Sequence, residues 1–277
     1  MNFDPRTTLR RDGLADLRLE GLIEAERFDA TRPMQAAMPS AAIRDAPDPA
    51  AQQVDQLLFG EGFEVLETRD GFHFGQARRD GYVGWVSADA LVEVGAPPTH
   101  WIGVRATFAF ATASIKAPAS EPIGLNSLVA ATDESGPFVR TACLGWLPKR
   151  HLIPIGEVRQ DPAAVALEHL HAPYLWGGRH ASGLDCSGLV QQARLACGLG
   201  CPRDTDQQQA LGAETPPDGL RRGDLVFWKG HVAMMIDAEV MVHANAFHMG
   251  VAIEPLAEAI QRIDAAGGGT PTAFRRP

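Results

Sequence analysis

Short apolar runs separated by turn residues follow one another in the first part of the chain, from Met34 onwards. Two of the turns contain Asp-Gly, in Arg69-Asp70-Gly71 and Arg79-Asp80-Gly81. Asp-Gly between alternating apolar runs is a strong hairpin signal, because these residues adopt the positive φ that a tight hairpin requires. Several short strands at this spacing predict a small β-barrel or sandwich. The strands expected are Met34–Met38, Gln56–Phe59, Glu64–Thr68, Phe72–Ala77 and Gly84–Val86, with a loop over Ile43–Ala51.

The same pattern starts again after Pro97-Pro98. Gly84-Trp85-Val86 and Gly145-Trp146-Leu147 occupy matching places, which indicates a weak internal repeat of about 60 residues. Each repeat resembles a bacterial SH3-type barrel, the first more clearly than the second. The alternative for both tryptophans is a plain core position. Strands are expected over Thr107–Thr112, Leu128–Ala131, Phe138–Thr141 and Leu144–Leu147.

Helical spacing appears past Pro154. Asp161-Pro162 has the form of an N-cap followed by proline at the first helical position. A second helix is expected from Cys186 to Gly198, because apolar residues recur there at a period near 3.6. Helices followed by an antiparallel run of strands indicate an α+β unit. The remaining elements expected are helices at Ala163–Leu170, from Asp204 and at Leu256–Ile263, and strands at Leu225–Trp228, Val232–Ile236, Val240–Ala244 and Val251–Ile253.

The changes in hydrophobic pattern along the sequence divide the chain into four parts. Residues 1–32 are a polar segment that fits either a strand pair or a short helix. Residues 33–96 and 97–156 are the two expected SH3-like barrels, and residues 157–277 are the α+β unit.

Composition and charge limit the classes of partner that the chain can bind. Lys plus Arg number 25 against 34 Asp plus Glu, a formal net charge of −9, and no basic cluster offsets it. We therefore expect neither nucleic acid nor a membrane surface as a partner. No apolar run approaches the roughly 18 residues of a membrane span, and residues 1–22 lack the form of a secretory signal. The expected location is the cytoplasm, with free thiols at Cys143, Cys186, Cys197 and Cys201.

Cys186 is the candidate nucleophile. A thiolate is stabilised at a helix N-terminus, and the sequence places Cys186 between Asp185 and an apolar-periodic helix. The backbone N–H groups of such a turn can also point at a developing oxyanion. The alternative is an ordinary structural cysteine.

His231 and His243 are the candidate base and its orienting partner. Lys229-Gly230 breaks the chain just before His231, which opens a strand, and His243 lies in the next strand. In an antiparallel pair both rings can lie on one face. A thiol nucleophile needs a base, and the base needs a third group that orients it.

A metal site is the competing interpretation of these residues. Cys186, His231 and His243 could ligate zinc, and Cys197-x-x-x-Cys201 adds two thiols. Cys197 falls on the expected buried face of its helix, without a matching Cys/His pair nearby, so we expect no metal and no cofactor. Cys143 is expected to be a small buried residue. Surface or packing roles are expected for His73, His100, His151, His169, His171, His180 and His248.

Three motifs resemble those of the NlpC/P60 cysteine peptidases, in that family's order. Pro173–Gly178 with Gly183–Val190 is similar to the nucleophile segment. Arg222–Ala233 resembles the segment that carries the catalytic histidine. Val242–Ala244 resembles the segment that carries the third, polar residue of the catalytic triad. The resemblance covers residues 157–277. It implies a papain-like α+β fold.

Two SH3-type barrels before such a domain are similar to the γ-D-glutamyl-L-diamino acid endopeptidases of the YkfC type. The resemblance implies hydrolysis of the bond between γ-linked D-Glu and a diamino acid in murein stem peptides that carry a free N-terminal L-Ala. It also implies amine recognition by an Asp, a Ser and a Tyr. These are Asp204, Ser187 and, from the first barrel, Tyr82. The alternatives are an N-cap for Asp204 and a core position for Tyr82.

We therefore expect a cytoplasmic cysteine peptidase of murein peptide recycling, with a murein peptide (L-Ala-γ-D-Glu-diamino acid) as its partner. One alternative is a secreted or wall-bound peptidoglycan hydrolase whose SH3-like domains anchor it to the wall. Others are a related amidase or acyltransferase, or a binding protein with a decayed site. The sequence leaves open the choice between meso-diaminopimelate and L-Lys, the oligomeric state, and whether an acidic residue of the first barrel also binds the amine.

Overall fold

The computed structural model describes residues 3–277. The chain forms two compact units, one ending at Ile155 and the other beginning at Gly156.

A small sheet forms within residues 3–32, the segment for which the sequence left strand and helix open. Its strands are β1 (Arg10–Arg11), β2 (Leu14–Asp16) and β3 (Arg27–Asp29), in the order β1-β2-β3, followed after β2 by the 3₁₀ helix η1 (Leu17–Leu19). Leu9 and Leu14 belong to a buried cluster with Phe74 and Trp85. The segment is therefore packed onto the sheet that follows it.

Seven strands form the next sheet, in the order β10-β4-β7-β8-β9-β5-β6. Asp70 and Gly71, at φ +51° and +78°, connect β7 and β8, so the hairpin predicted at this Asp-Gly is confirmed. The strands are β4 (Arg32–Ala36), β5 (Ser40–Arg44), β6 (Gln53–Leu58), β7 (Gly62–Arg69), β8 (Phe72–Ala77), β9 (Val83–Ser87) and β10 (Leu91–Glu93), with η2 at Ala88–Ala90.

Two details of this region differ from the sequence analysis or refine it. Ile43 was expected in a loop, but it lies in β5 with its side chain completely buried in the core, and the prolines at 47 and 49 come only after the strand ends. Trp85 is 1% exposed and packs against Phe74 with ring centroids 5.1 Å apart. Trp85 therefore has the core position weighed as its alternative.

Residues 97–155 form small sheets around a core that also includes Phe59. The core contains Ile102, Ile123, Val129 and Leu147, and Trp146 is half-buried. Cys143 was expected to be buried and is exposed, because it lies in the turn between β16 and β17. The strands are β11 (His100–Ile102), β12 (Ala106–Thr107), β13 (Ile123–Gly124), β14 (Leu128–Val129), β15 (Ala131–Ser135), β16 (Phe138–Thr141), β17 (Gly145–Pro148) and β18 (Leu152–Pro154), with η3 at Lys149–His151.

The C-terminal unit contains a six-stranded sheet in the order β21-β26-β22-β23-β24-β25. Its strands are β21 (Ala213–Glu214), β22 (Leu225–Trp228), β23 (His231–Met235), β24 (Val240–Asn245), β25 (Gly250–Pro255) and β26 (Ala273–Arg276). The short pair β19 (Arg179–His180) and β20 (Gly183–Leu184) leads into the second helix. The helices are α1 (Pro162–Leu167), α2 (Cys186–Ala196), α3 (Thr205–Gln208) and α4 (Leu256–Ala265), with η4 at Pro217–Gly219. All four helices and the strands β22 to β25 confirm the elements expected in this part of the chain.

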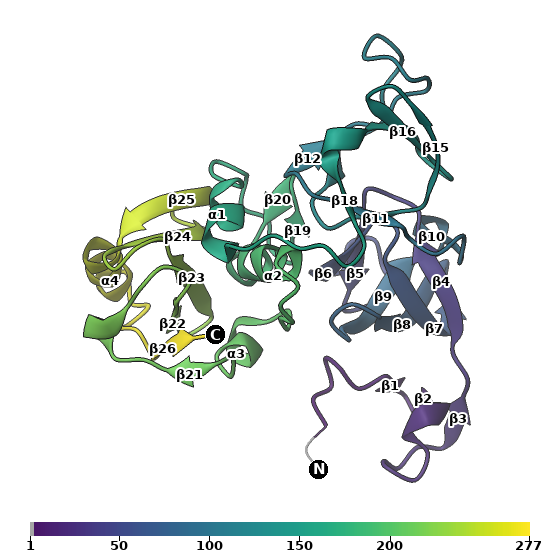
Figure 1. Cartoon of the computed structure of the whole chain (residues 1–277). Helices are drawn as coiled ribbons and strands as arrows, with labels where there is room; N and C mark the ends of the chain where they lie inside the picture. The colour runs from purple at the N-terminus through teal and green to yellow at the C-terminus, as the bar shows by residue number, and fades with distance from the viewer. Residues whose placement is uncertain (1–2) are drawn as a thin grey trace. The chain divides into compact units, whose positions relative to one another are not determined.

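The central strands β22, β23 and β24 are buried on both faces. α1 and α2 contact β23 and β24, and α4 contacts β25; Figure 1 shows α4 on one side of these strands and α1 and α2 on the other. The N-cap predicted at Asp161 is confirmed, since its side chain accepts from the N–H groups of Ala163 and Ala164. Gly198, at φ +71°, follows the end of α2 as predicted. The packing therefore holds the first turn of α2 against the strands that carry the histidines.

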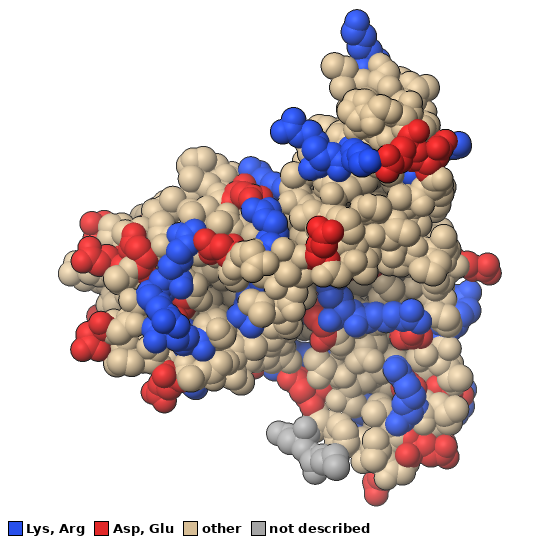
Figure 2. Space-filling view, viewed as in Figure 1, with Lys and Arg blue, Asp and Glu red and all other residues tan. Residues whose placement is uncertain are grey.

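Within residues 3–277, no helix combines the length and the apolar character that crossing a bilayer requires. On the face shown in Figure 2, Lys and Arg side chains are interspersed with Asp and Glu and do not merge into one broad basic surface.

Candidate active site

Cys186 is the first residue of α2, and buried polar contacts hold the start of this helix. The N-cap Asp185 accepts from the N–H of Gly188 through Oδ1 at 2.7 Å and from the N–H of Gly177 through Oδ2 at 2.9 Å. Arg203, 1% exposed, donates to the same two oxygens from Nη1 at 2.9 Å and from Nη2 at 2.7 Å. This two-pronged contact keeps the turn before Cys186 in one geometry.

The sulfur of Cys186 lies against the backbone on both sides of His231. Its Sγ is 4.0 Å from the carbonyl oxygen of Gly230, and the N–H of Val232 donates to it. On another side, Oγ1 of Thr205 is 3.7 Å away. The sulfur of Cys186 and the first residues of β23 therefore share one site.

Burial and the neighbouring Asp185 carboxylate raise the pKa of the Cys186 thiol to about 11, against the opposing effects of Val232, Thr205 and Arg203. A helix N-terminus alone would lower this pKa. Here the cost of a buried thiolate outweighs that effect, so the resting sulfur is a neutral thiol.

His231 and His243 lie on neighbouring strands and contact each other directly. Nε2 of His231 is 2.9 Å from Nδ1 of His243, and the ring centroids are 5.2 Å apart. Because β23 and β24 pair Met234 with Val242, the two histidines are diagonal neighbours on one face. This contact leaves Nδ1 of His231 as the ring atom that can take a proton.

Both imidazoles are neutral near pH 7. Burial, with smaller contributions from nearby charges, lowers the pKa of His231 to about 4. Burial and the neighbouring His231 lower the pKa of His243 to about 3. A neutral imidazole on the strand that the thiol contacts can act as a general base, because it has not yet accepted a proton.

Asp204, Ser187 and Tyr82 are the residues expected to bind the substrate amine. Asp204 is the N-cap of α3 in a capping box, and its N–H donates to Oε1 of Gln207 at 3.4 Å, so the capping role weighed for it is present. Ser187 is 5% exposed; its hydroxyl donates to Asp185 at 3.2 Å and accepts from Arg203 at 2.9 Å. Both lie in the same unit as Cys186.

Tyr82 belongs to the other unit. It is 6% exposed and packs in the core cluster with Ile43 and Val86, and its N–H donates to Oδ1 of Asp80 at 3.0 Å. It also lines a cavity of about 320 Å³ together with Asp45 and Trp85. Tyr82 thus combines the core position weighed for it with access to a cavity.

Sequence reasoning missed several residues near the sulfur. Thr205 and Arg203 are two of them, and neither stands out by spacing. Tyr174 is a third: burial, with Cys186 as the next contribution, raises the pKa of its phenol, so the phenol stays protonated. Tyr174 was within a quoted motif, so its type was available as a signal.

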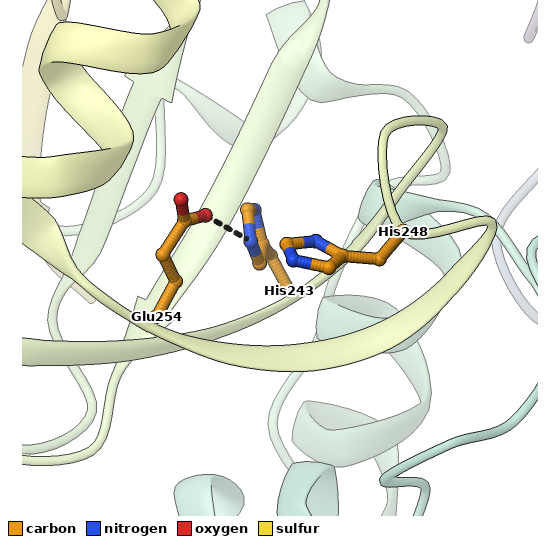
Figure 3. Close-up of side chains that lie close together, drawn as sticks. All are labelled: His243, His248 and Glu254. Atoms are coloured by element: carbon orange, nitrogen blue, oxygen red, sulfur yellow. Dashed lines mark ion pairs between the residues drawn. The ribbon is translucent and has the colours of Figure 1, made fainter.

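One group of side chains has the composition of a metal site. The ligand atoms of His243, His248 and Glu254 all lie within 4.8 Å of one another. Figure 3 shows the three side chains together. Arg262, however, donates to both oxygens of Glu254, from Nε at 2.8 Å and from Nη2 at 2.6 Å. A guanidinium on the carboxylate opposes a second cation there. The sequence also allows a zinc site formed by Cys186, His231 and His243. In the structure, one ring nitrogen of His231 and one of His243 contact each other and are not free to bind a metal together.

A cysteine at a helix start, facing a strand that carries one of two paired histidines, is the arrangement of a cysteine peptidase. Comparison with known proteins agrees with this class. Residues 171–264 match the NlpC/P60 family, and residues 43–91 match the bacterial dipeptidyl-peptidase SH3 domain. The chain therefore contains an NlpC/P60 cysteine peptidase domain and, before it, a bacterial dipeptidyl-peptidase SH3 domain.

Two curated relatives share most of the chain. Dipeptidyl-peptidase 6 of Lysinibacillus sphaericus is 28% identical over 225 residues, which are 72% of this chain and 82% of the relative. Gamma-D-glutamyl-L-lysine dipeptidyl-peptidase of Bacillus subtilis (strain 168) is 28% identical over 228 residues, 74% and 76% of the two chains. The crystal structure of an NlpC/P60 family protein from Bacillus cereus ATCC 10987 superimposes with a TM-score of 0.74 at 19% identity, covering 88% of this chain and 99% of that one. The last comparison shows that the fold is shared.

Proposed function

We propose that this chain hydrolyses the γ-D-glutamyl–diamino acid bond of murein stem peptides that begin with a free L-Ala. The observation that carries the proposal is the Cys186 sulfur seated against Gly230 and Val232, on either side of a histidine that is itself 2.9 Å from a second histidine. The bond specificity is supported by the relatives, one of which is named for γ-D-glutamyl-L-lysine.

In the first step Cys186 attacks the γ-carbonyl carbon of D-Glu. As the S–C bond forms, Nδ1 of His231 takes the thiol proton, because thiol and imidazole are both neutral at rest. The N–H of Cys186 is a first-turn amide, which a helix leaves without an intrahelical acceptor, and it donates to the oxyanion. The protonated phenol of Tyr174 is a second donor near the sulfur.

In the second step the C–N bond breaks and His231 returns its proton to the leaving amine of the diamino acid. The D-Glu carbonyl remains on the sulfur as a thioester. Water attacks this thioester with His231 again as base, which releases L-Ala-D-Glu and restores the thiol. The steps use side chains of this chain and water, with no cofactor.

Recognition of the free amine is assigned to Asp204, Ser187 and Tyr82. An anionic Asp204 pairs with the ammonium of L-Ala, so a substrate without that charge leaves the carboxylate unpaired and is rejected. Tyr82→Phe should raise KM for the free-amine peptide and leave kcat nearly unchanged; equal KM values would remove Tyr82 from this set.

The test of the proposal is product analysis by mass spectrometry. Wild-type protein should convert L-Ala-γ-D-Glu-meso-diaminopimelate and its L-Lys counterpart into L-Ala-D-Glu and the free diamino acid. Cys186→Ala should make neither product while its thermal unfolding remains that of the wild type. Turnover by Cys186→Ala, or cleavage at another bond by the wild type, would contradict the proposal.

A role in recycling within the cytoplasm follows from the preference for short peptides with a free amine. Binding to insoluble murein discriminates this role from wall anchoring. We expect the intact protein to remain in the supernatant when murein sacculi are sedimented. Strong co-sedimentation would favour an anchoring role for the SH3-like domains instead.

A further inference from the structure

A buried carboxylate adjoins the outer histidine of the site. Oε2 of Glu254 lies 3.1 Å from Nε2 of His243, the contact drawn as a dashed line in Figure 3. β24 and β25 pair His243 with Ala252, so Glu254 is the diagonal neighbour of His243 on the same face. His231, His243 and Glu254 therefore follow one another across three adjacent strands, β23, β24 and β25.

Glu254 cannot turn away freely, because Arg262 of α4 holds both of its oxygens, from Nε at 2.8 Å and from Nη2 at 2.6 Å. Arg262 in turn lies over the ring of Phe247, 4.5 Å from its centroid. Hydrogen bonds from Arg262 lower the pKa of Glu254, so the group is a carboxylate at neutral pH. The carboxylate can accept a hydrogen bond from an N–H of His243, but it has no hydrogen to donate.

The direction of the hydrogen bond between the two histidines depends on this acceptor. In one arrangement Nε2 of each ring carries hydrogen: His231 donates to Nδ1 of His243, and His243 faces Glu254 with an N–H. In the other arrangement Nδ1 of each ring carries hydrogen, and His243 faces the carboxylate with a lone pair. The first is attractive and the second repulsive at 3.1 Å.

Catalysis requires the first arrangement. It leaves a lone pair on Nδ1 of His231, which can accept the thiol proton, whereas the second arrangement places hydrogen on that atom. Nε2 of His243 is buried and makes no aligned hydrogen bond within the described residues, since its contact with Glu254 is short but not in line. The carboxylate is the acceptor within reach of this N–H.

We propose that Glu254, held by Arg262, is a positioning residue that sets the tautomers of His243 and His231 and thereby makes His231 a base. The inference rests on the roles proposed above for Cys186, His231 and His243. It concerns bond direction rather than net charge, because Arg262 and Glu254 have opposing effects on the pKa of His231.

The same assignment argues against a cation among these three side chains. Nδ1 of His248 is 3.0 Å from Oδ1 of Asn245, an acceptor, so Nδ1 carries the hydrogen and Nε2 is the free nitrogen. His243 could ligate a metal only through the lone pair on Nε2, which is the tautomer that disables His231. Addition of Zn²⁺ would therefore inhibit if it bound there.

The kinetic test uses Glu254→Gln and Glu254→Ala with a matched control. We expect kcat to fall at least about 10-fold with little change in KM, within the about 10⁴-fold loss that a wrong histidine tautomer causes in a serine peptidase. In a His243→Ala background the Glu254 substitutions should cause no further loss, because their effect passes through His243. The control is Asp224→Asn, a carboxylate that Arg276 holds by a similar fork at 3.0 and 2.7 Å; it should lower Tm and leave kcat near that of the wild type.

The decisive readout is the protonation of each ring nitrogen. Long-range ¹H–¹⁵N spectra of the histidine-labelled protein, assigned with His231→Gln and His243→Gln, should show hydrogen on Nε2 of both rings in the wild type. Glu254→Gln should show a mixture. Hydrogen on Nδ1 in the wild type, or unchanged tautomers together with unchanged kcat in both Glu254 variants, would overturn the inference. If the tautomers are as expected but Cys186→Ala still turns over substrate, the proposed function fails and the assignment of Glu254 stands.

Discussion

The guanidinium of Arg203 and the carboxylate of Asp185 form a buried pair beneath the first turn of α2, with contacts of 2.9 and 2.7 Å. Arg203 also donates to the hydroxyl of Ser187 at 2.9 Å. The residues on both sides of Cys186 are thus tied to one side chain from the segment before α3. The position of the nucleophile depends on this pair.

Arg203→Met should lower the free energy of unfolding of the C-terminal unit by about 3–5 kcal/mol, because it leaves a buried carboxylate without its partner. Arg222→Met is the matched control: Arg222 pairs with Asp161 at 2.8 Å, but both side chains are more than 40% exposed, so the loss should stay below about 1 kcal/mol. Chemical denaturation measures both. Equal losses would show that the Arg203 pair contributes no more than a surface pair.

Gly188→Ala should lower turnover as well as stability. A Cβ at Gly188 would lie 2.2 Å from the carbonyl oxygen of Gly178, so the first turn of α2 would have to move away from that loop. Gly200→Ala is the control, because a Cβ there meets nothing within 4 Å. We expect a lower Tm and a lower kcat for Gly188→Ala, and wild-type values for Gly200→Ala. A fully active Gly188→Ala would mean that this approach does not position Cys186.

The C-terminal unit should lose stability as the pH falls from about 6.5 towards 4. The pKa of His231 is lowered to about 4 and that of His243 to about 3, mainly by burial, so the unfolded chain binds protons there before the folded protein does. Stability is therefore fully present above the unfolded pKa and declines with acid. Thermal unfolding across this range should show a shallower decline in His243→Gln than in the wild type. Parallel curves for the two proteins would contradict the buried, neutral state of His243.

Asp204→Asn and Asp204→Ala separate amine recognition from helix capping. Asn is as good an N-cap as Asp but has no charge. If Asp204 binds the substrate ammonium, both variants should lose the preference for free-amine over N-acetylated peptides, measured as the ratio of kcat/KM values. If Asp204 only caps α3, Asn should keep the wild-type ratio.

Periodicity predicts the elements that carry Cys186, His231 and His243 well, because apolar residues recur regularly along them. Strands β22 to β25 begin or end within a few residues of the expected positions, since their alternating residues are buried on both faces of the sheet. α2 was found from its apolar spacing and from Gly198. β26 was missed: its four residues, Ala273–Arg276, include two arginines and are held mainly by backbone pairing with β22 and β21. Such pairing leaves little trace in local sequence.

Some residues of the candidate site could likewise be predicted from the sequence, and others could not. Cys186, His231 and His243 could be proposed from the sequence because each stands at a recognisable helix start or strand position. Arg203, Thr205 and Glu254 could not, because each reaches the site through pairing between segments distant in the chain. Glu254 follows directly after the expected strand Val251–Ile253, so its face was predictable, but its distance from His243 was not. The raised pKa of Cys186 also required the burial that only the structure shows.

We expect the Cys186 sulfur to carry the acyl group during turnover, and this covalent intermediate can be trapped. Wild-type protein mixed with L-Ala-γ-D-Glu-diaminopimelate and quenched rapidly in acid should gain the mass of an L-Ala-D-Glu acyl group, which peptide mapping should place on Cys186. The exposed Cys143 is an internal control and should stay unmodified. Turnover without any adduct, or an adduct on a residue other than Cys186, would contradict the account.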